Sequence, residues 1–199
     1  MKKIIATAIF CSFVSIIGLF SQDAAKSHFS IQYDMSFGMG DLGDYISAPS
    51  FRGASAQYRY AVAHNVLVGI DAAWNVFYEK RDYDSYTSGT VTLSGVQYRY
   101  QNQVPLLVSA DYVFTPDKDF QPYIGLGLGT MYSERNTEMG IWVLEENPWQ
   151  FALKPELGMM YKFSYGSAFK LGVKYYAGFG GDLGTQGYLT VSAGFAFGF

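Results

Sequence analysis

Four acidic and four basic side chains are the strongest candidates for chemistry in this sequence. Each stands inside a run in which apolar and polar residues alternate, and each occupies a polar position of its run. They are Asp34, Arg59, Asp71, Asp111, Lys154, Glu156, Lys170 and Lys174. If the polar positions share one enclosed space, charges there must be paired and hydrogen-bonded. The equal numbers predict a structural network of salt bridges, and a conducting or ligand-selecting path is the alternative.

Catalysis would require a nucleophile with a base beside it. The sequence has only two histidines, His28 and His64, and both fall at the ends of alternating runs. His28-Phe29-Ser30 resembles the His-x-Ser motif of a lipid A deacylase, but Ile31 follows where that motif has asparagine. The glycines of 125–129 recur at every second position of a run, which is typical of a strand and not of a nucleotide-binding loop before a helix. We therefore expect no enzyme, no catalytic residue, no cofactor and no metal site.

Eight alternating runs must position these side chains. A tilted strand needs about 9–11 residues to cross a bilayer, and each run reaches or exceeds this length. The runs cover 28–40, 51–62, 65–79, 102–114, 120–133, 149–163, 168–179 and 187–199. The charges avoid the apolar parity, as expected where a lipid-facing charge costs about 2–4 kcal/mol. The pattern predicts an all-β fold, an eight-stranded antiparallel transmembrane β-barrel, with a bulge or kink at Pro155.

The connections between the runs alternate between short turns and longer loops, which is typical of outer-membrane barrels. The second long loop, at roughly 80–101, carries Tyr83, Tyr86 and Tyr98. Tyrosines are useful in recognition surfaces, and extension of a hairpin beyond the membrane is the alternative. The third long loop contains Trp142 within the apolar stretch 141–144. We expect this stretch to cap the barrel mouth, with contact to a partner as the alternative.

The amino-terminal segment predicts export. Lys2 and Lys3 precede an uncharged stretch over 4–20, which favours a cleaved signal peptide at 1–21 and a barrel domain at 22–199. A retained membrane anchor is the alternative. Cys11, the only cysteine, lies in the signal segment, so no disulfide is expected. Without Lys2 and Lys3 the chain has 12 basic and 17 acidic residues, a formal charge of −5, which argues against a nucleic-acid partner.

The composition also favours a membrane barrel. Aromatic residues make up 18% of the chain and glycine occupies 22 positions, yet the mean hydropathy is only +0.04. A transmembrane barrel needs an apolar residue only at every second position, so average hydropathy is expected. The alternative is a soluble, lipocalin-like barrel with its apolar face turned inward. Its outer face should then be rich in charges, whereas the second face here is largely small and polar.

Four stretches resemble known outer-membrane families. The last strand has the spacing of the carboxy-terminal signal that the barrel-assembly machinery reads, carried by Ser192, Gly194, Phe197 and Phe199. The stretches 104–114 and 120–127 resemble a hairpin of OmpW-like small barrels, and 153–158 with Tyr161 resembles the porin-like β-barrel family. The OmpW-like resemblance implies a path for small hydrophobic molecules. The charged interior positions depart from it and resemble the plugged interior of OmpX- or OmpA-like barrels.

The sequence therefore predicts a monomeric barrel in the outer membrane of a Gram-negative cell. The leading hypothesis is a non-enzymatic role in envelope integrity, with passage of a small hydrophobic or polar solute. The alternative is a surface interaction or adhesion protein that acts through its long loops. The expected partners are outer-membrane lipids, lipopolysaccharide and, during biogenesis, the barrel-assembly machinery.

Overall fold

The computed structural model describes residues 27–88, 91–139, 142–181 and 183–198. The predicted signal peptide and Phe199 lie outside these residues. Within these described residues, nine strands and one short helix follow one another. They are β1 (Ser27–Gly40), α2 (Asp41–Tyr45), β2 (Ser50–Ala63), β3 (Val66–Ser88), β4 (Val91–Val113), β5 (Phe120–Met139), β6 (Trp142–Glu146), β7 (Trp149–Ser164), β8 (Ser167–Phe179) and β9 (Gln186–Phe197).

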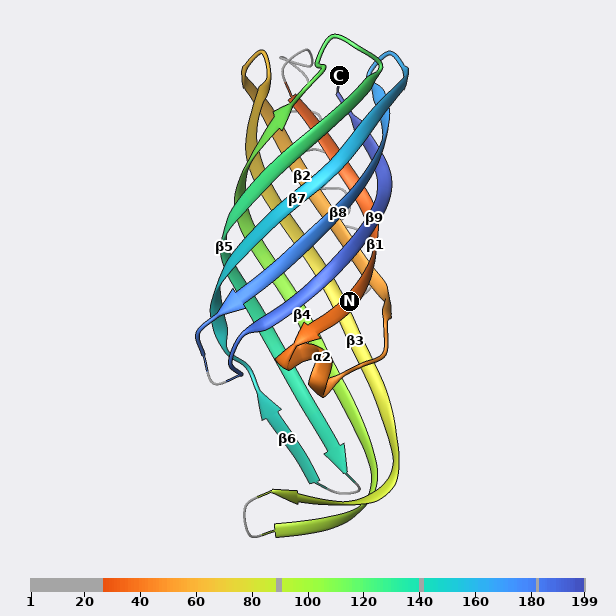
Figure 1. The fold of residues 1–199 in the computed structure, drawn as a ribbon, viewed down its shortest axis with the longest axis vertical. Helices are drawn as coiled ribbons and strands as arrows, with labels where there is room; N and C mark the ends of the chain where they lie inside the picture. The colour runs from red at the N-terminus through yellow and green to blue at the C-terminus, as the bar shows by residue number, and fades with distance from the viewer. Residues whose placement is uncertain (1–26, 89–90, 140–141, 182, 199) are drawn as a thin grey trace, which may run out of the picture.

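Eight of the strands close into a barrel. Their order around the ring is β4-β3-β2-β1-β9-β8-β7-β5, and antiparallel pairing of β5 with β4 completes it. The first and last strands are neighbours, with Phe29 opposite Phe197 and Gly40 opposite Gln186. Closure leaves no sheet edge within the ring, which is what a hydrocarbon environment requires. The predicted eight-stranded antiparallel barrel is confirmed (Figure 1).

The outer wall of the barrel is apolar and the interior is polar. Ile70, Val108 and Leu157 are each more than 60% exposed, whereas the alternate positions of the same strands are buried. Aromatic side chains border this apolar belt, as they do at membrane interfaces. We call Trp74, Tyr132 and Trp149 the outer girdle; its Tyr132 and Trp149 rings lie 5.2 Å apart. The lipocalin-like alternative is wrong, because the apolar face points outward.

The long-loop end differs from the prediction. The region 80–101 is not a loop, because β3 and β4 continue as a paired hairpin to Ser88 and Val91, which confirms the alternative of a hairpin extended beyond the membrane. β5 also extends to Met139, and β6 pairs with it outside the ring. These extensions project beyond the barrel (Figure 1). The alternation of apolar residues did not mark them, since a hairpin outside the membrane needs no lipid-facing side chains.

The two prolines within strands interrupt the ladders without shifting them. Pro155 pairs with Leu126 of β5, while the pairing of β7 with β8 stops at Leu153 and resumes at Glu156 in the same register. The expectation was a bulge or a kink at Pro155, and the unbroken register excludes the bulge. Since proline lacks an N–H, the ladder loses a donor on one side only, and the neighbouring faces keep their assignment. Pro105 interrupts the β3–β4 ladder in the same way.

A short helix closes the first long connection. Gly40, with φ of +56°, lets the chain turn from β1 into α2. Leu42 and Ile46 are four residues apart and both are fully buried, so they point toward the same side. Among the described residues, no helix has the length and apolar character needed to cross a membrane.

Candidate functional site

The structure places all eight charged residues singled out in the sequence inside the barrel. β1 to β4 contribute Asp34, Arg59, Asp71 and Asp111, one from each strand, and β7 and β8 contribute two each. None is more than 5% exposed. The positions alternate with the lipid-facing ones, so the period of the strands alone turns these side chains inward. We call the eight residues the charge network.

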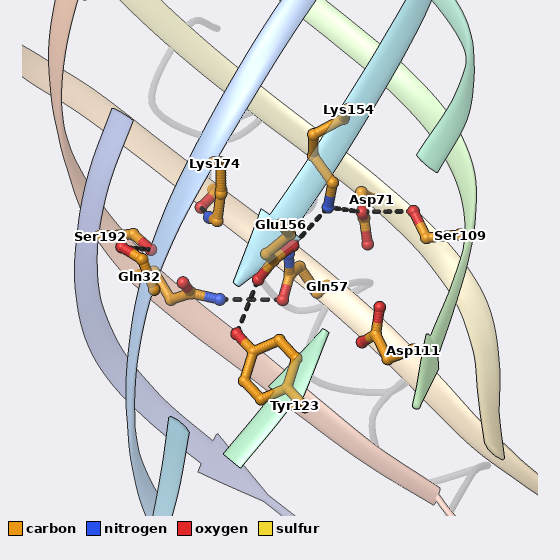
Figure 2. A network of polar contacts seen from close by, with 12 residues as sticks. Gln32, Gln57, Asp71, Ser109, Asp111, Tyr123, Lys154, Glu156, Lys174 and Ser192 are labelled. Atoms are coloured by element: carbon orange, nitrogen blue, oxygen red, sulfur yellow. Dashed lines mark hydrogen bonds and ion pairs between the residues drawn. The ribbon is translucent and has the colours of Figure 1, made fainter. Parts of the chain in front are cut away.

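Arg59 and Lys154 both bind Asp71 at the centre of the charge network. The Arg59 Nη1 atom contacts Asp71 Oδ1, and its Nε atom lies 2.6 Å from Asp111 Oδ2. Lys154 Nζ contacts the second oxygen of Asp71 and lies 2.6 Å from Glu156 Oε2. Ser109 donates a hydrogen bond of 2.5 Å to Asp71 (Figure 2). Removing Asp71 would leave each of these buried cations with a single carboxylate partner, Asp111 for Arg59 and Glu156 for Lys154.

Glu156 collects a second group of donors. Tyr123 donates to its Oε1 at 2.7 Å and Gln57 donates to its Oε2 at 3.0 Å (Figure 2). Lys170 Nζ is 3.9 Å from this carboxylate and 4.6 Å from the centre of the Tyr123 ring. The same ammonium group donates to Gln57 at 2.6 Å. Neutral and charged donors together therefore satisfy one buried carboxylate.

Lys174 and Asp34 form the remaining pair. The Lys174 ammonium lies 3.4 Å from Asp34 Oδ1 and 2.7 Å from Ser55 Oγ, which itself donates to Asp34. With this pair, four cations and four carboxylates balance in the network. A ring of eight strands is only wide enough for side chains to fill it. The arrangement therefore serves as a polar core, with every cation in contact with a carboxylate.

Two apolar clusters lie inside the barrel, one on each side of the charge network. The outer apolar cluster, at the long-loop end, consists of Leu42, Ile46, Ala73, Phe77, Leu107, Met131, Ala152, Tyr176 and Tyr188. The inner apolar cluster, at the short-turn end, consists of Val113, Tyr123, Met160, Ala168 and Ala196. In the outer cluster, Tyr188 stacks on Tyr176 at 4.8 Å and meets Phe77 edge to face at 5.5 Å. The charge network thus lies between two apolar clusters.

Polar contacts hold α2 over the outer apolar cluster. The Tyr45 ring lies 4.8 Å from the Arg99 guanidinium and 4.1 Å from that of Arg135. Its hydroxyl group is 2.6 Å from Thr137, and burial raises the pKa of this hydroxyl above its usual value. The Glu79 carboxylate accepts hydrogen bonds from the backbone of Ser47 and Ala48. The first loop is therefore a fixed cap.

This cap is the feature that the sequence analysis missed. Capping was expected of the stretch 141–144, but Val143 and Leu144 are 55% and 62% exposed, so these two side chains do not cap the mouth. Leu42 and Ile46 fill it instead. Their spacing of four residues in a loop rich in glycine was the available signal, since apolar residues at i and i+4 share one face of a helix.

The other predicted residues lie at the two ends of the barrel. Tyr83 is 73% exposed on the β3 extension, and Tyr98 is half-buried on β4. Tyr86 belongs to β3 and Trp142 to β6, and the structure describes only the backbone of these two residues. Ser192 is buried and Phe197 is about half exposed on β9, where Gly194 faces Gln32 of β1.

The histidines line a hollow at the short-turn rim. This hollow of about 670 Å³ is bordered by both His28 and His64, with Leu67 and Met160 toward the inner apolar cluster. His64 Nε2 lies 3.1 Å from the exposed Asp117 carboxylate. Within the described ranges, no group of three or more His, Cys, Asp or Glu residues is arranged to hold a metal ion.

The closed ring, the apolar outer wall and the filled polar interior define a small outer-membrane β-barrel, and the protein therefore lies in an outer membrane. Among solved structures, the chain is similar to Neisserial surface protein A, with a TM-score of 0.57 and 14% identity over 87% of this chain and 97% of that one. It is also similar to Ail, the attachment invasion locus protein of Yersinia pestis, with a TM-score of 0.51 and 16% identity over 86% and 98%. No protein-family model and no curated protein sequence matches the chain.

Proposed function

We propose that this protein is a non-enzymatic barrel that is closed to solutes and contributes to the integrity of the outer membrane. The observation that carries the proposal is the enclosure of the charge network between the outer and inner apolar clusters. An ion that entered the interior would have to cross two apolar layers and displace paired charges, which is energetically costly. The filled interior favours a structural role over the solute path that the OmpW-like resemblance implied.

Electrical recording tests this proposal. The refolded protein in a planar bilayer is expected to show no discrete conductance, because the paired charges and the two apolar clusters occupy the interior of the ring. The Lys154→Gln variant should likewise show no discrete conductance. Openings in the unmodified protein, with an amplitude or ion selectivity that Lys154→Gln changes, would show that the interior is a path and would overturn the proposal. Before recording, the protein must be shown to be folded by its resistance to unfolding in cold detergent.

Surface recognition is a second candidate, favoured by the length of β3, β4 and β5. These strands continue beyond the outer girdle. The β3 extension exposes Tyr83, and β6, which pairs with the β5 extension, exposes Val143 and Leu144. Exposed aromatic and apolar side chains on a rigid sheet suit contact with a partner. Ail, which shares the fold, was crystallised with the heparin analogue sucrose octasulfate. That ligand provides a first probe for this protein as well.

Shortening the β3–β4 hairpin tests the recognition role. Replacing residues 83–96 by a two-residue turn should leave the membrane-embedded ring folded, since the paired residues described in this range pair only with one another. Cells that display the shortened protein should lose adherence to heparin-coated plates, and free sucrose octasulfate should compete with the full-length protein. Equal adherence of both proteins would count against recognition through the hairpin, whereas the conductance result would be unaffected.

A further inference from the structure

Three tyrosines form a platform on the outside of the barrel, just beyond the outer girdle. The register of the sheet places Tyr78 opposite Tyr100, and Tyr98 is next to them between Lys80 and Glu138. The Tyr78 and Tyr100 rings are 4.8 Å apart. Because outward positions recur at every second residue, Tyr78 is on the same face as Trp74 of the outer girdle. We call Tyr78, Tyr98 and Tyr100 the tyrosine platform.

Hydrogen-bonding groups surround the tyrosine platform. Asn136 is opposite Tyr100, and Glu138 is opposite Tyr98. On the side toward the membrane, Asn102 donates a hydrogen bond of 2.9 Å to Glu134. The face therefore combines aromatic rings with carboxylates and amides that can accept or donate several hydrogen bonds. A sugar offers the complementary chemistry, since its C–H face packs on aromatic rings and its hydroxyl groups bind carboxylates and amides.

The position of the tyrosine platform identifies the source of the sugar. Aromatic girdles lie at the interface between hydrocarbon and headgroups. Groups that follow the outer girdle on the outward face therefore lie at the level of the outer-leaflet headgroups, which are saccharides in an outer membrane built from glycolipid. The charge of the patch argues against a phosphate. Lys80 and the nearby Arg52 are balanced by Glu134 and Glu138, so no net positive charge is present to hold an anion.

We propose that the tyrosine platform binds the saccharide of an outer-leaflet glycolipid. Tyr78, Tyr98 and Tyr100 stack on the sugar rings, while Glu134, Glu138 and Asn102 bind their hydroxyl groups. This inference goes beyond the proposed function, because it concerns the lipid around the barrel and holds whether or not the interior conducts. It also differs from recognition by the hairpin tip, which lies farther from the membrane.

Saccharide titration tests the inference. The probe is the soluble core oligosaccharide of lipopolysaccharide, freed of lipid A and added to the protein in phosphatidylcholine nanodiscs, with binding followed by saturation-transfer NMR. Replacing all three tyrosines by valine, which keeps strand propensity, should weaken binding at least tenfold. Replacing them by phenylalanine should keep most of the binding, because the rings remain. Tyr165→Val, at the fully exposed short turn, is the matched control and should bind as the unmodified protein does.

Three outcomes would overturn the inference. In the first, the valine variant binds the oligosaccharide as tightly as the unmodified protein. In the second, inorganic phosphate competes with the oligosaccharide and Lys80→Gln abolishes binding. In the third, the tyrosine platform binds a protein partner and not the oligosaccharide. If the valine variant fails to fold, the single changes Tyr78→Val and Tyr98→Val replace it, and each should weaken binding severalfold. Shortening the hairpin at 83–96 leaves the tyrosine platform in place, so it separates this site from the recognition candidate.

Discussion

Replacing Asp71 by asparagine is expected to lower the free energy of unfolding by about 3–5 kcal/mol, the usual cost of breaking a buried ion pair. Asp71 is the carboxylate that Arg59 and Lys154 share. Asparagine has the same size but no charge, so both cations lose one partner and the interior gains a net positive charge. Arg59 and Lys154 are fully buried, so bulk water does not readily replace the lost partner.

Urea-induced unfolding of the protein in phospholipid vesicles measures this change. Asp84→Asn is the matched control, because Asp84 is an exposed residue of the same strand and its loss should shift stability by no more than about 0.5 kcal/mol. Adding Lys154→Met to Asp71→Asn removes the excess positive charge of the interior and should recover a large part of the loss. If both the single and the double variant were as stable as the unmodified protein, the charge network would not be the core of the barrel.

The strand ring and the two faces of its wall could be predicted from the sequence, since a period of two assigns each residue to lipid or interior. Ile70 and Asp71 illustrate this, because adjacent positions had to point in opposite directions. The pairing within the interior could not be predicted. Lys154 of β7 meets Asp71 of β3 across the barrel, and that contact depends on the stagger of all the intervening strands.

The long-loop end was less predictable for a physical reason. The lipid that imposes apolar alternation on the ring is missing there, so nothing in the hydropathy of 80–101 distinguished a hairpin from a loop. The tyrosine platform illustrates the consequence. Tyr98 was noted as a loop residue, but only the register of β3, β4 and β5 shows that it lies beside Tyr78 and Tyr100. Contacts between strands, and not local sequence, create this surface.

The cap at the outer end gives the second large effect. Leu42→Ala is expected to lower the free energy of unfolding by about 2–5 kcal/mol, because the side chain is fully buried in the outer apolar cluster and its removal leaves a cavity. Leu144→Ala makes the same chemical change at a residue that is 62% exposed, and should shift stability by no more than about 0.5 kcal/mol. Urea-induced unfolding measures both variants under the same conditions.

The same variant separates the role of the cap from that of the charge network. A helix of five residues has little stability of its own, so α2 depends on its buried side chains to stay in place. Leu42→Ala should therefore make 41–49 several times more sensitive to added protease, while Leu144→Ala should not. Leu42→Ala should nevertheless show no discrete conductance in a planar bilayer, because the charge network and the inner apolar cluster remain below the cap. Discrete openings in Leu42→Ala would assign closure of the barrel to the cap alone.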